Sequence, residues 1–578
     1  MDSITREVIR ASLLAYADEM TKNFWRSSYS HMNYEVRDFA VGFVDPEGRI
    51  ITQSRFTHPA FTADLGFVVR DAIAEQDEIN PDDVIMSNDP ESQGQHLNNV
   101  VVITPIYFCG ELIAFSCVRA HWEDIGGATI GSTGTKTTDI YQEGLQLKAI
   151  KAYQKGVPNK EVLKIISSNS RFPKIILGDF NAQIAACKLG ERRFGSLLLK
   201  YGPEDVVRAI HEGWDMSERA ARVALREIPK GEYRAESFLD NDGVELDRPV
   251  EIRVLVRVTE DKMVIDFSGV ADQVKGPLNS GYFGGALNVG RIAFKCLTTP
   301  QLPSDEGCFR PLEVVCPKGK MLNAAFPAAL AHWSVPFPTI LDTIFRALAD
   351  AIPQRIPAAT RGDARGVGVT GYDVSKGKFF HLSPPHMGGH GARPDADGPT
   401  PKCAIQQGDE HAVPIEVCET KSPIIFESLR LRQDSGGAGK FRGGLGIDAV
   451  FSLEIEGRLR NMMIRSKCPP WGIHGGREGA PNEAFVMKPD GSAELLPRTT
   501  DYPIPPGLKI RLLTGGGGGY GNPLERDEDQ VLQDVLDGYV SLQAAEEQYG
   551  VVIDSTNFTI DKEATLKKRR AMVEGSKR

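Results

Sequence analysis

The chain has 578 residues, 41% of them hydrophobic and 25% charged, so we expect an ordered protein of roughly two to four domains. The net charge of −10 and the lack of a basic stripe argue against a nucleic-acid-binding protein, and no apolar stretch is long enough to cross a membrane. Nine cysteines without a CxxC pair form neither a disulfide framework nor a zinc ribbon. The charged N-terminus has no apolar core typical of a secretory signal, so we expect a cytoplasmic protein.

The first predicted elements are a helix and a β-hairpin. Residues 3–24 repeat apolar side chains at helical spacing, with Ser3 as N-cap. The segment "RDFAVGFVDPEGRIITQS" alternates apolar and polar residues on both sides of a Pro-Glu-Gly turn, which predicts a hairpin with Asp38 at its open end. Residues 60–77 are predicted to be helical, and "DDVIMSNDP" to be a strand that ends in a polar turn.

A second hairpin is predicted over residues 94–127, "GQHLNNVVVITPIYFCGELIAFSCVRAHWEDIGG". Two apolar runs flank a short turn that contains a glycine, as is typical of a hairpin. Pairing outward from Phe108 opposite Glu111 puts His121 opposite Asn98, and His96 opposite residue 123. The two imidazoles then lie at the same open end of the hairpin, one diagonal step apart.

Two imidazoles at one hairpin end indicate a divalent metal site. A single histidine is usually only a hydrogen-bonded residue, but carboxylates and amides surround this pair. Two imidazoles and one carboxylate leave coordination positions open for water or substrate, as catalytic sites require, and further polar groups can orient the imidazoles. The polar residues predicted at this end are Asp38, Asn98, Asn99, Glu123 and Asp124.

Two acids follow the Ser/Thr-rich loop after the hairpin. Asp139 and Glu143 stand in "DIYQEG", where the simpler interpretation is helix capping and solvent exposure. The alternative is that Glu143 lines the active cavity.

The rest of the chain changes from helices to strands. Residues 159–230 are predicted to be mostly helical, with breaks at prolines and glycines, including Gly178 and Gly190. Strands follow from residue 231, a helix returns near residues 338–352, and residues 411–518 are strand-rich before a helical tail. We therefore predict a mixed α/β (α+β), multidomain fold with a hairpin-rich metal-binding N-terminal domain, a central helical segment and a β-rich C-terminal half. The predicted domains are 1–158 (α/β, with the metal site), 159–230 (helical), 231–410 (mixed α/β) and 411–578 (β-rich, with the helical tail).

Three glycine-rich stretches do not match a phosphate-binding loop. "TGGGGGYGNP" has no lysine, "DSGGAGKFRGG" has Phe441 where a Ser or Thr should hold Mg²⁺, and "GGATIGSTGTKTTD" has Thr135 before its lysine. We expect these glycines to allow tight turns or close backbone contacts, and we expect no ATP site in this chain.

Ordered motifs along nearly the whole chain resemble the hydantoinase B/oxoprolinase family. The N-terminal matches are "EVIRASLLAYADEM", "RDFAVGFVDPEGRI", the histidine hairpin and "TTDIYQEGLQL". Later matches are "DFSGVADQVKGPLN", "DEGCFRPLEVVCPKGKMLN", "GGHGARPDADG", "LRQDSGGAGKFRGGLG" and "TGGGGGYGNPLERD". The family includes subunits of ATP-dependent hydantoinases, caprolactamase, 5-oxoprolinase, and acetone and acetophenone carboxylases.

The resemblance implies a site for one divalent ion (Zn²⁺, Mn²⁺ or Fe²⁺) on Asp38, His96 and His121. The family usually has a proline and an aspartate after His-Leu, where this chain has Asn98 and Asn99. An amide at position 99 can coordinate through its oxygen but adds no charge, so we expect the site either to bind its ion less tightly or to prefer a different ion or substrate. Asp124, in "RAHWEDIGG", is the implied residue for orienting a ligand or transferring a proton.

The resemblance also implies a partner and a reaction. A larger subunit with an actin-like ATPase fold would bind ATP and Mg²⁺ and phosphorylate the amide oxygen of a cyclic amide, which this subunit would then hydrolyse. An α2β2 heterotetramer is the implied assembly. Two alternatives stay open: a ketone carboxylase subunit, and a scaffold subunit that only stabilises the ATPase.

Overall fold

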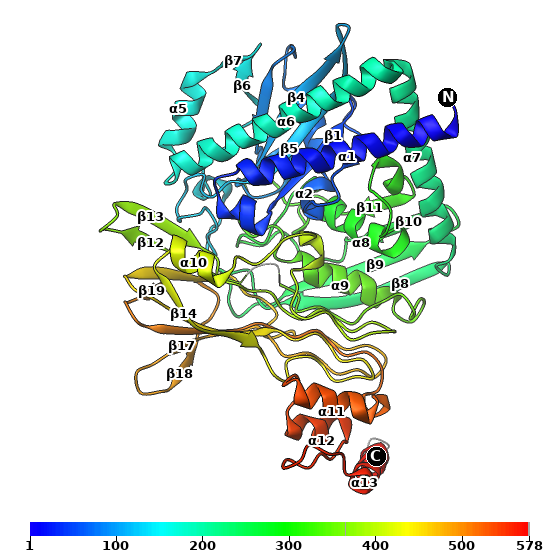
Figure 1. The fold of residues 1–578 in the computed structure, drawn as a ribbon, viewed down its shortest axis with the longest axis vertical. Helices are drawn as coiled ribbons and strands as arrows, with labels where there is room; N and C mark the ends of the chain where they lie inside the picture. The colour runs from blue at the N-terminus through cyan, green and yellow to red at the C-terminus, as the bar shows by residue number, and fades with distance from the viewer. Residues whose placement is uncertain (364–365, 576–578) are drawn as a thin grey trace.

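The computed structural model describes residues 1–363 and 366–575, and it confirms the predicted mixed α/β architecture (Figure 1). The strands of the described residues form four sheets. One sheet lies in the N-terminal third of the chain, one in the middle and two in the C-terminal half. The helical tail projects from the opposite end of the molecule to α1 and α6 (Figure 1).

The N-terminal sheet has the strand order β2-β1-β5-β4-β3-β6-β7. Its strands are β1 (Phe39–Val44), β2 (Ile50–Gln53), β3 (Val84–Ser87), β4 (Asn99–Phe108), β5 (Glu111–His121), β6 (Ile150–Gln154) and β7 (Val157–Pro158). Helices α1 (Ser3–Ser27) and α6 (Pro173–Tyr201) cross one face (Figure 1), where Phe24 packs edge-on against Phe39. The other face packs on α3 (Leu65–Ala74), which follows α2 (Pro59–Thr62). Because side chains alternate along each strand, the sheet separates two cores.

The register of the histidine hairpin differs from the predicted one. The turn is the two-residue Cys109-Gly110, with positive φ at both residues, as a tight hairpin requires. Phe108 does pair with Glu111, but the register shifts between Ile106 and Tyr107, so one residue of β5 bulges out. The prediction that His121 faces Asn98 is therefore wrong. His121 pairs with Asn99.

The predicted helical segment contains α5 (Lys160–Ser168), α6 and α7 (Pro203–Arg226). The predicted breaks at Gly178 and Gly190 are wrong, because α6 runs through both. A Cβ at Gly178 would lie 2.4 Å from the Tyr29 ring, and one at Gly190 would lie 2.4 Å from the Met20 sulfur. These glycines let α6 approach the N-terminal segment closely. The first two predicted domains share one hydrophobic cluster, to which α1, α6, α7 and the N-terminal sheet all contribute. The predicted domain limits stay predictions.

The middle of the chain forms a sheet of order β11-β10-β9-β8, which packs on α9 (Phe337–Leu348). The strands predicted from residue 231 are confirmed here, and β9 pairs with β10 antiparallel. The elements of this region are β8 (Gly231–Leu239), β9 (Val250–Val258), β10 (Met263–Asp266), β11 (Leu312–Val315) and α8 (Asn288–Thr298).

Two antiparallel sheets make up the C-terminal half, with orders β13-β12-β16-β19 and β14-β15-β20-β17-β18. Their strands are β12 (Val367–Asp373), β13 (Lys378–Leu382), β14 (Ile424–Leu431), β15 (Ile447–Leu453), β16 (Gly457–Asn461), β17 (Glu483–Met487), β18 (Ala493–Leu495), β19 (Thr499–Ile504) and β20 (Lys509–Leu513). Helix α10 (Ile415–Lys421) precedes β14. The tail forms α11 (Glu528–Leu536), α12 (Leu542–Tyr549) and α13 (Lys562–Gly575), with a small hydrophobic cluster of its own.

Two of the three glycine-rich stretches, residues 434–444 and 514–523, pack directly against each other through their backbones. Gly517 donates its N–H to the carbonyl of Gly444 and accepts one from Gly437. A Cβ on Gly517 would lie 1.9 Å from the carbonyl oxygen of His390. The expected structural role is confirmed here, because any side chain would force these segments apart.

Among the described residues, no helix is both long and apolar enough to cross a membrane.

Candidate metal centre

Three adjacent strands carry Asp38, His121 and Asn99 in one row. Asp38 immediately precedes β1, and its carbonyl accepts the N–H of His121 at 3.1 Å. His121 ends β5 and pairs with Asn99 at the start of β4. Residues directly opposite each other in antiparallel strands point to the same face, so the three side chains project to one side of the sheet. All three are at least 95% buried.

His96 joins this row from the turn that precedes β4. Its Nε2 lies 2.8 Å from Asn99 Oδ1, and its ring centroid lies 4.9 Å from that of His121, nearly edge-on. The structure thus places the four residues that we predicted as metal ligands at one end of the sheet, with Asp38 linked to His121 through its backbone; that they bind an ion stays a prediction. The contact between His96 and Asn99 is a hydrogen bond, and its length is close to the roughly 3.0 Å between neighbouring ligands that each lie about 2.1 Å from one octahedral ion.

A buried chain of polar contacts fixes the orientation of Asn99. Its Nδ2 donates to Gln95 Oε1 at 2.8 Å, so its Oδ1 must face His96. Gln95 Nε2 in turn donates to Asp64 at 2.9 Å, and Asp64 forms an ion pair of 2.7 Å with Arg119. Burial raises the pKa of Asp64, an effect that Arg119 opposes. Such contacts behind a ligand hold its donor atom in position.

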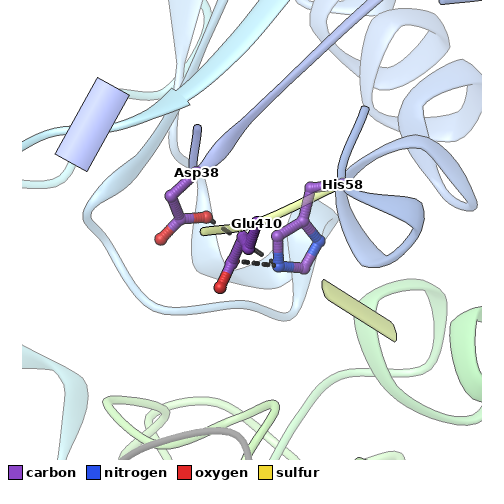
Figure 2. Close-up of side chains that lie close together, drawn as sticks. All are labelled: Asp38, His58 and Glu410. Atoms are coloured by element: carbon purple, nitrogen blue, oxygen red, sulfur yellow. Dashed lines mark ion pairs between the residues drawn. The ribbon is translucent and has the colours of Figure 1, made fainter. Parts of the chain in front are cut away.

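Two further residues, which the sequence analysis missed, meet Asp38 from other segments. His58 Nε2 lies 2.9 Å from Glu410 Oε1 and 3.8 Å from Asp38 Oδ1. One donor atom from each of the three residues lies within 4.8 Å of the others. Figure 2 shows the three side chains converging, with one carboxylate oxygen of Asp38 directed toward His58 and the other pointing away.

A local signal for His58 existed, but none existed for Glu410. His58 precedes Pro59 at the start of α2, and it follows the hairpin that ends beside Asp38. Its place next to that open end could therefore have been anticipated. Glu410 lies more than 350 residues farther along the chain, and no spacing rule connects it with this sheet.

A small cavity adjoins Asp38, His58 and Glu410. Its volume is about 50 Å³, which is enough for one or two waters. Apolar side chains form much of its wall, including Met32, Val36, Phe61, Trp333, Met387, Val413 and Met462. Trp333 also lies 6.1 Å from His96, centroid to centroid, so this wall connects the cavity with the histidine pair.

Asp124 holds together two loops. Its Oδ1 accepts the Gly131 N–H and an Arg171 guanidinium N–H, both at 2.9 Å, and its Oδ2 accepts the Arg171 backbone N–H at 2.8 Å. These contacts support a positioning role. Proton transfer by Asp124 stays a prediction.

Glu143 anchors a distant segment to the loop that follows the hairpin. Its Oε1 accepts the N–H groups of Leu330 and Ala331 and the hydroxyl of Thr137. Burial raises its pKa to about 8, although these three hydrogen bonds oppose the shift. Neither Glu143 nor Asp124 is among the described residues of the cavity wall, so a catalytic role for Glu143 also stays a prediction.

Glu123, just beyond His121, belongs to a separate polar cluster. His381 on β13 lies 2.8 Å from Glu123 Oε1, and His31 lies 3.5 Å from Oε2. Burial alone would raise the pKa of Glu123, but the positive charge of His31 and hydrogen bonds from His381 and Ser30 lower it to about 2. This cluster links the N-terminal sheet to the C-terminal half.

Comparison with known proteins decides the family. A model described as hydantoinase B/oxoprolinase matches residues 2–523. The chain belongs to the hydantoinase B/oxoprolinase family.

Similarity within this family extends over the whole chain. The chain is 34% identical over 576 residues to a protein of Methanocaldococcus jannaschii, covering 98% of this chain and all of the relative. It is 30% identical over 600 residues to caprolactamase subunit beta of Pseudomonas jessenii, covering 99% of each chain.

Two solved structures share the fold of this family member. The crystal structure of ATP-dependent caprolactamase from Pseudomonas jessenii matches with a TM-score of 0.92 and 29% identity, over 99% of this chain and all of the other. Acetone carboxylase in its nucleotide-free structure also matches with a TM-score of 0.92, over all of this chain and 83% of that one. At 17% identity, the second likeness shows a shared fold alone.

Proposed function

We propose that this chain is the metal-binding subunit of an ATP-dependent cyclic-amide hydrolase that opens a lactam, hydantoin or oxoproline ring. One observation carries the proposal: Asp38, His96, Asn99 and His121 lie at one end of a sheet, where Asp38 lines a cavity. The similarity to caprolactamase subunit beta over nearly the whole chain supports the substrate class.

The residues present fit a divalent transition ion. Imidazole nitrogens with carboxylate and amide oxygens suit Zn²⁺, Mn²⁺ and Fe²⁺ alike, and four protein donors leave room for substrate in a five- or six-coordinate site. When bound, such an ion supplies a Lewis acid that lowers the pKa of water and stabilises developing negative charge.

The chain's own residues orient the ligands and exclude water. Gln95 directs the Asn99 oxygen toward His96, and Asp38 holds the backbone of His121. Phe61 and Trp333 form an apolar wall, which strengthens electrostatic interactions inside the site by keeping solvent out. The substrate ring would lie against this wall, with its amide facing the histidines.

A larger partner subunit would supply the activation step. An unstrained amide resists hydrolysis, and transfer of phosphate from ATP to its oxygen would create a leaving group. We propose that an actin-like ATPase subunit binds ATP and Mg²⁺ and assembles with this chain as an α2β2 heterotetramer. Two of the glycine-rich stretches, residues 434–444 and 514–523, pack backbone against backbone, which supports assigning the nucleotide to the partner.

The test is ring opening by the complex with its partner subunit. We expect ATP-dependent opening of at least one of 5-oxoproline, hydantoin and caprolactam, lost in His96→Ala and kept in His211→Ala, an exposed histidine on α7. The rival function, a ketone carboxylase, has the fold of acetone carboxylase in its favour. ATP turnover that requires bicarbonate and a ketone, without ring opening, would replace our proposal with that one.

A further inference from the structure

We propose that Asp38, His58 and Glu410 hold a second divalent ion beside the first, with the Asp38 carboxylate shared between the two. The inference rests on the proposed function, because Asp38 belongs to both ligand sets. It adds two ligands, His58 and Glu410, from segments outside the histidine hairpin.

The spacing of the three donor atoms matches one coordination sphere. Ligands about 2.1 Å from a common ion lie roughly 3.0 Å apart in octahedral geometry and 3.4 Å apart in tetrahedral geometry. The distances from His58 Nε2 are 2.9 Å to Glu410 and 3.8 Å to Asp38, so small side-chain shifts would bring all three onto one ion. Imidazole and carboxylate are ligands for Zn²⁺, Mn²⁺ and Fe²⁺.

His58 is fixed in place before any ion binds. Its backbone N–H donates to the carbonyl of Phe39, the residue next to Asp38, at 3.1 Å. Its ring stacks on Phe61 with a centroid distance of 4.4 Å and an interplanar angle of 23°. Pro59 fixes the start of α2 directly after it. The imidazole is thus held with Nε2 toward the two carboxylates.

Glu410 is fixed by contacts to the turn that precedes Asp38. The N–H of the next residue, His411, donates to the carbonyl of Val36 at 3.0 Å. On the other side of Glu410, Asp409 forms an ion pair of 2.8 Å with Arg37. Gln407 Nε2 donates to Glu410 Oε2, which leaves Oε1 directed toward His58. Although distant in sequence, Glu410 is therefore preorganised against the N-terminal sheet.

Asp38 lies where the two ligand sets meet. Its Oδ1 faces His58, while its backbone binds His121, whose ring adjoins His96. The second oxygen of Asp38 points away from His58 and Glu410 (Figure 2). In known two-metal sites the ions lie about 3.5–4 Å apart and clamp the attacking and leaving oxygens of the substrate. Asp38, His58 and Glu410 all line the cavity, so a ligand on the second ion could reach the substrate.

The decisive experiment is metal stoichiometry of the full chain purified with its partner subunit. Wild type and variants would be stripped with a chelator, reloaded with Mn²⁺ and analysed for bound metal and for magnetic coupling by EPR. We expect about two ions in wild type with a coupled spectrum, and about one ion with an uncoupled spectrum in His58→Gln, Glu410→Gln and His121→Ala. The control is His211→Ala, at an exposed histidine on α7 that does not line this cavity, and this variant should keep both ions.

Every other outcome of this experiment contradicts a specific part of the proposal. One ion in wild type, kept in His58→Gln and Glu410→Gln but lost in His121→Ala, would show that His58 and Glu410 form only an ion pair. One ion lost in all three variants would show a single centre with shared ligands. One ion lost in His58→Gln but kept in His121→Ala would instead overturn the site of the proposed function. Circular dichroism of each variant shows whether metal loss reflects unfolding.

Discussion

Two clusters of histidines and carboxylates lie at the same end of the β4–β5 hairpin, and they differ in what they can bind. In the first, His58 and Glu410 meet Asp38 at the wall of a cavity, and His96 and His121 adjoin each other at the ends of the neighbouring strands. In the second, His31 and His381 flank Glu123, and none of the three is among the described residues of that cavity wall.

The difference shows that residue type alone does not make a metal site. Glu123 accepts hydrogen bonds from His381 and Ser30 and lies beside His31, and its pKa of about 2 reflects these contacts. The first cluster places donor atoms of Asp38, His58 and Glu410 within 4.8 Å of one another, beside a cavity of about 50 Å³. The same chemical groups therefore give a structural ion-pair cluster in one place and a candidate catalytic centre in the other.

The largest expected effect separates the two clusters directly. His121→Ala should abolish metal binding at the hairpin end and lower ring-opening activity more than 100-fold, which exceeds the cost of losing an outer hydrogen-bond partner. His381→Ala, the matched variant in the second cluster, should keep the metal. Elemental analysis and the ATP-dependent assay measure both. Metal lost in His381→Ala but not in His121→Ala would reverse the comparison.

The free energy of unfolding, in contrast, should depend more on the Glu123 cluster than on the metal-site residues. Glu123→Gln is expected to lower the free energy of unfolding by about 3 kcal/mol at neutral pH, because it breaks a buried charged cluster. Since the folded pKa of about 2 lies below the ordinary value of 4.5, this stabilisation is present above pH 4.5 and is lost as the pH falls toward 2. Urea unfolding of wild type and variant at several pH values tests this. An unchanged midpoint at pH 7 would contradict it.

Removing the contacts that support Asn99 should have a smaller effect, and on metal affinity alone. Gln95→Ala removes the group that directs the Asn99 oxygen toward His96, so we expect metal affinity to fall about 10- to 100-fold. Competition with a chromophoric chelator measures this affinity. Gln76→Ala, on α3's C-terminal side and away from the site, serves as the control. Equal affinities in both variants would show that Asn99 needs no support or is not a ligand.

Introducing a carboxylate at position 99 should increase the metal affinity of the site. Asn99→Asp adds a negative charge beside two imidazoles, and we expect about tenfold tighter metal binding, or about 1.4 kcal/mol. The lost contact from Asn99 Nδ2 to Gln95 offsets part of the gain. The same chelator competition measures it. Weaker binding in this variant would argue that position 99 does not face the ion.

Glu143 should give the smallest effect if it only anchors Leu330 and Ala331. Gln at this position can still accept the three hydrogen bonds, so Glu143→Gln should keep activity within about twofold. Because the folded pKa of about 8 lies above the ordinary value of 4.5, wild-type stability should fall as the pH rises from 4.5 to 8, and the variant should lack this dependence. Loss of activity without loss of stability would instead support a catalytic role.

The hairpin end could be predicted because its residues are close in sequence. His96, Asn99 and His121 belong to one β-hairpin, and Asp38 ends the neighbouring one. Even there, a single bulge near Ile106 changed which asparagine faces His121, and bulges leave no clear sequence pattern. The strands and most helices followed from local periodicity, and the structural role of two glycine-rich stretches followed from their mismatch with phosphate-binding loops.

Contacts between distant segments could not be predicted. Glu410 meets His58 only because residues 405–411 fold back onto the start of β1, and His381 reaches Glu123 from β13. The course of α6 through Gly178 and Gly190 depends on close packing against Tyr29 and Met20, which a local helix propensity does not contain. These features arise from tertiary packing, which overrides local signals.

Anomalous scattering from a crystal of the metal-loaded protein tests the central claim most directly. Data collected on both sides of the metal's absorption edge should give a strong peak within about 2.3 Å of donor atoms of His96 and His121. A peak at the His31–Glu123–His381 cluster instead, or none at the hairpin end of an active enzyme, would contradict the account.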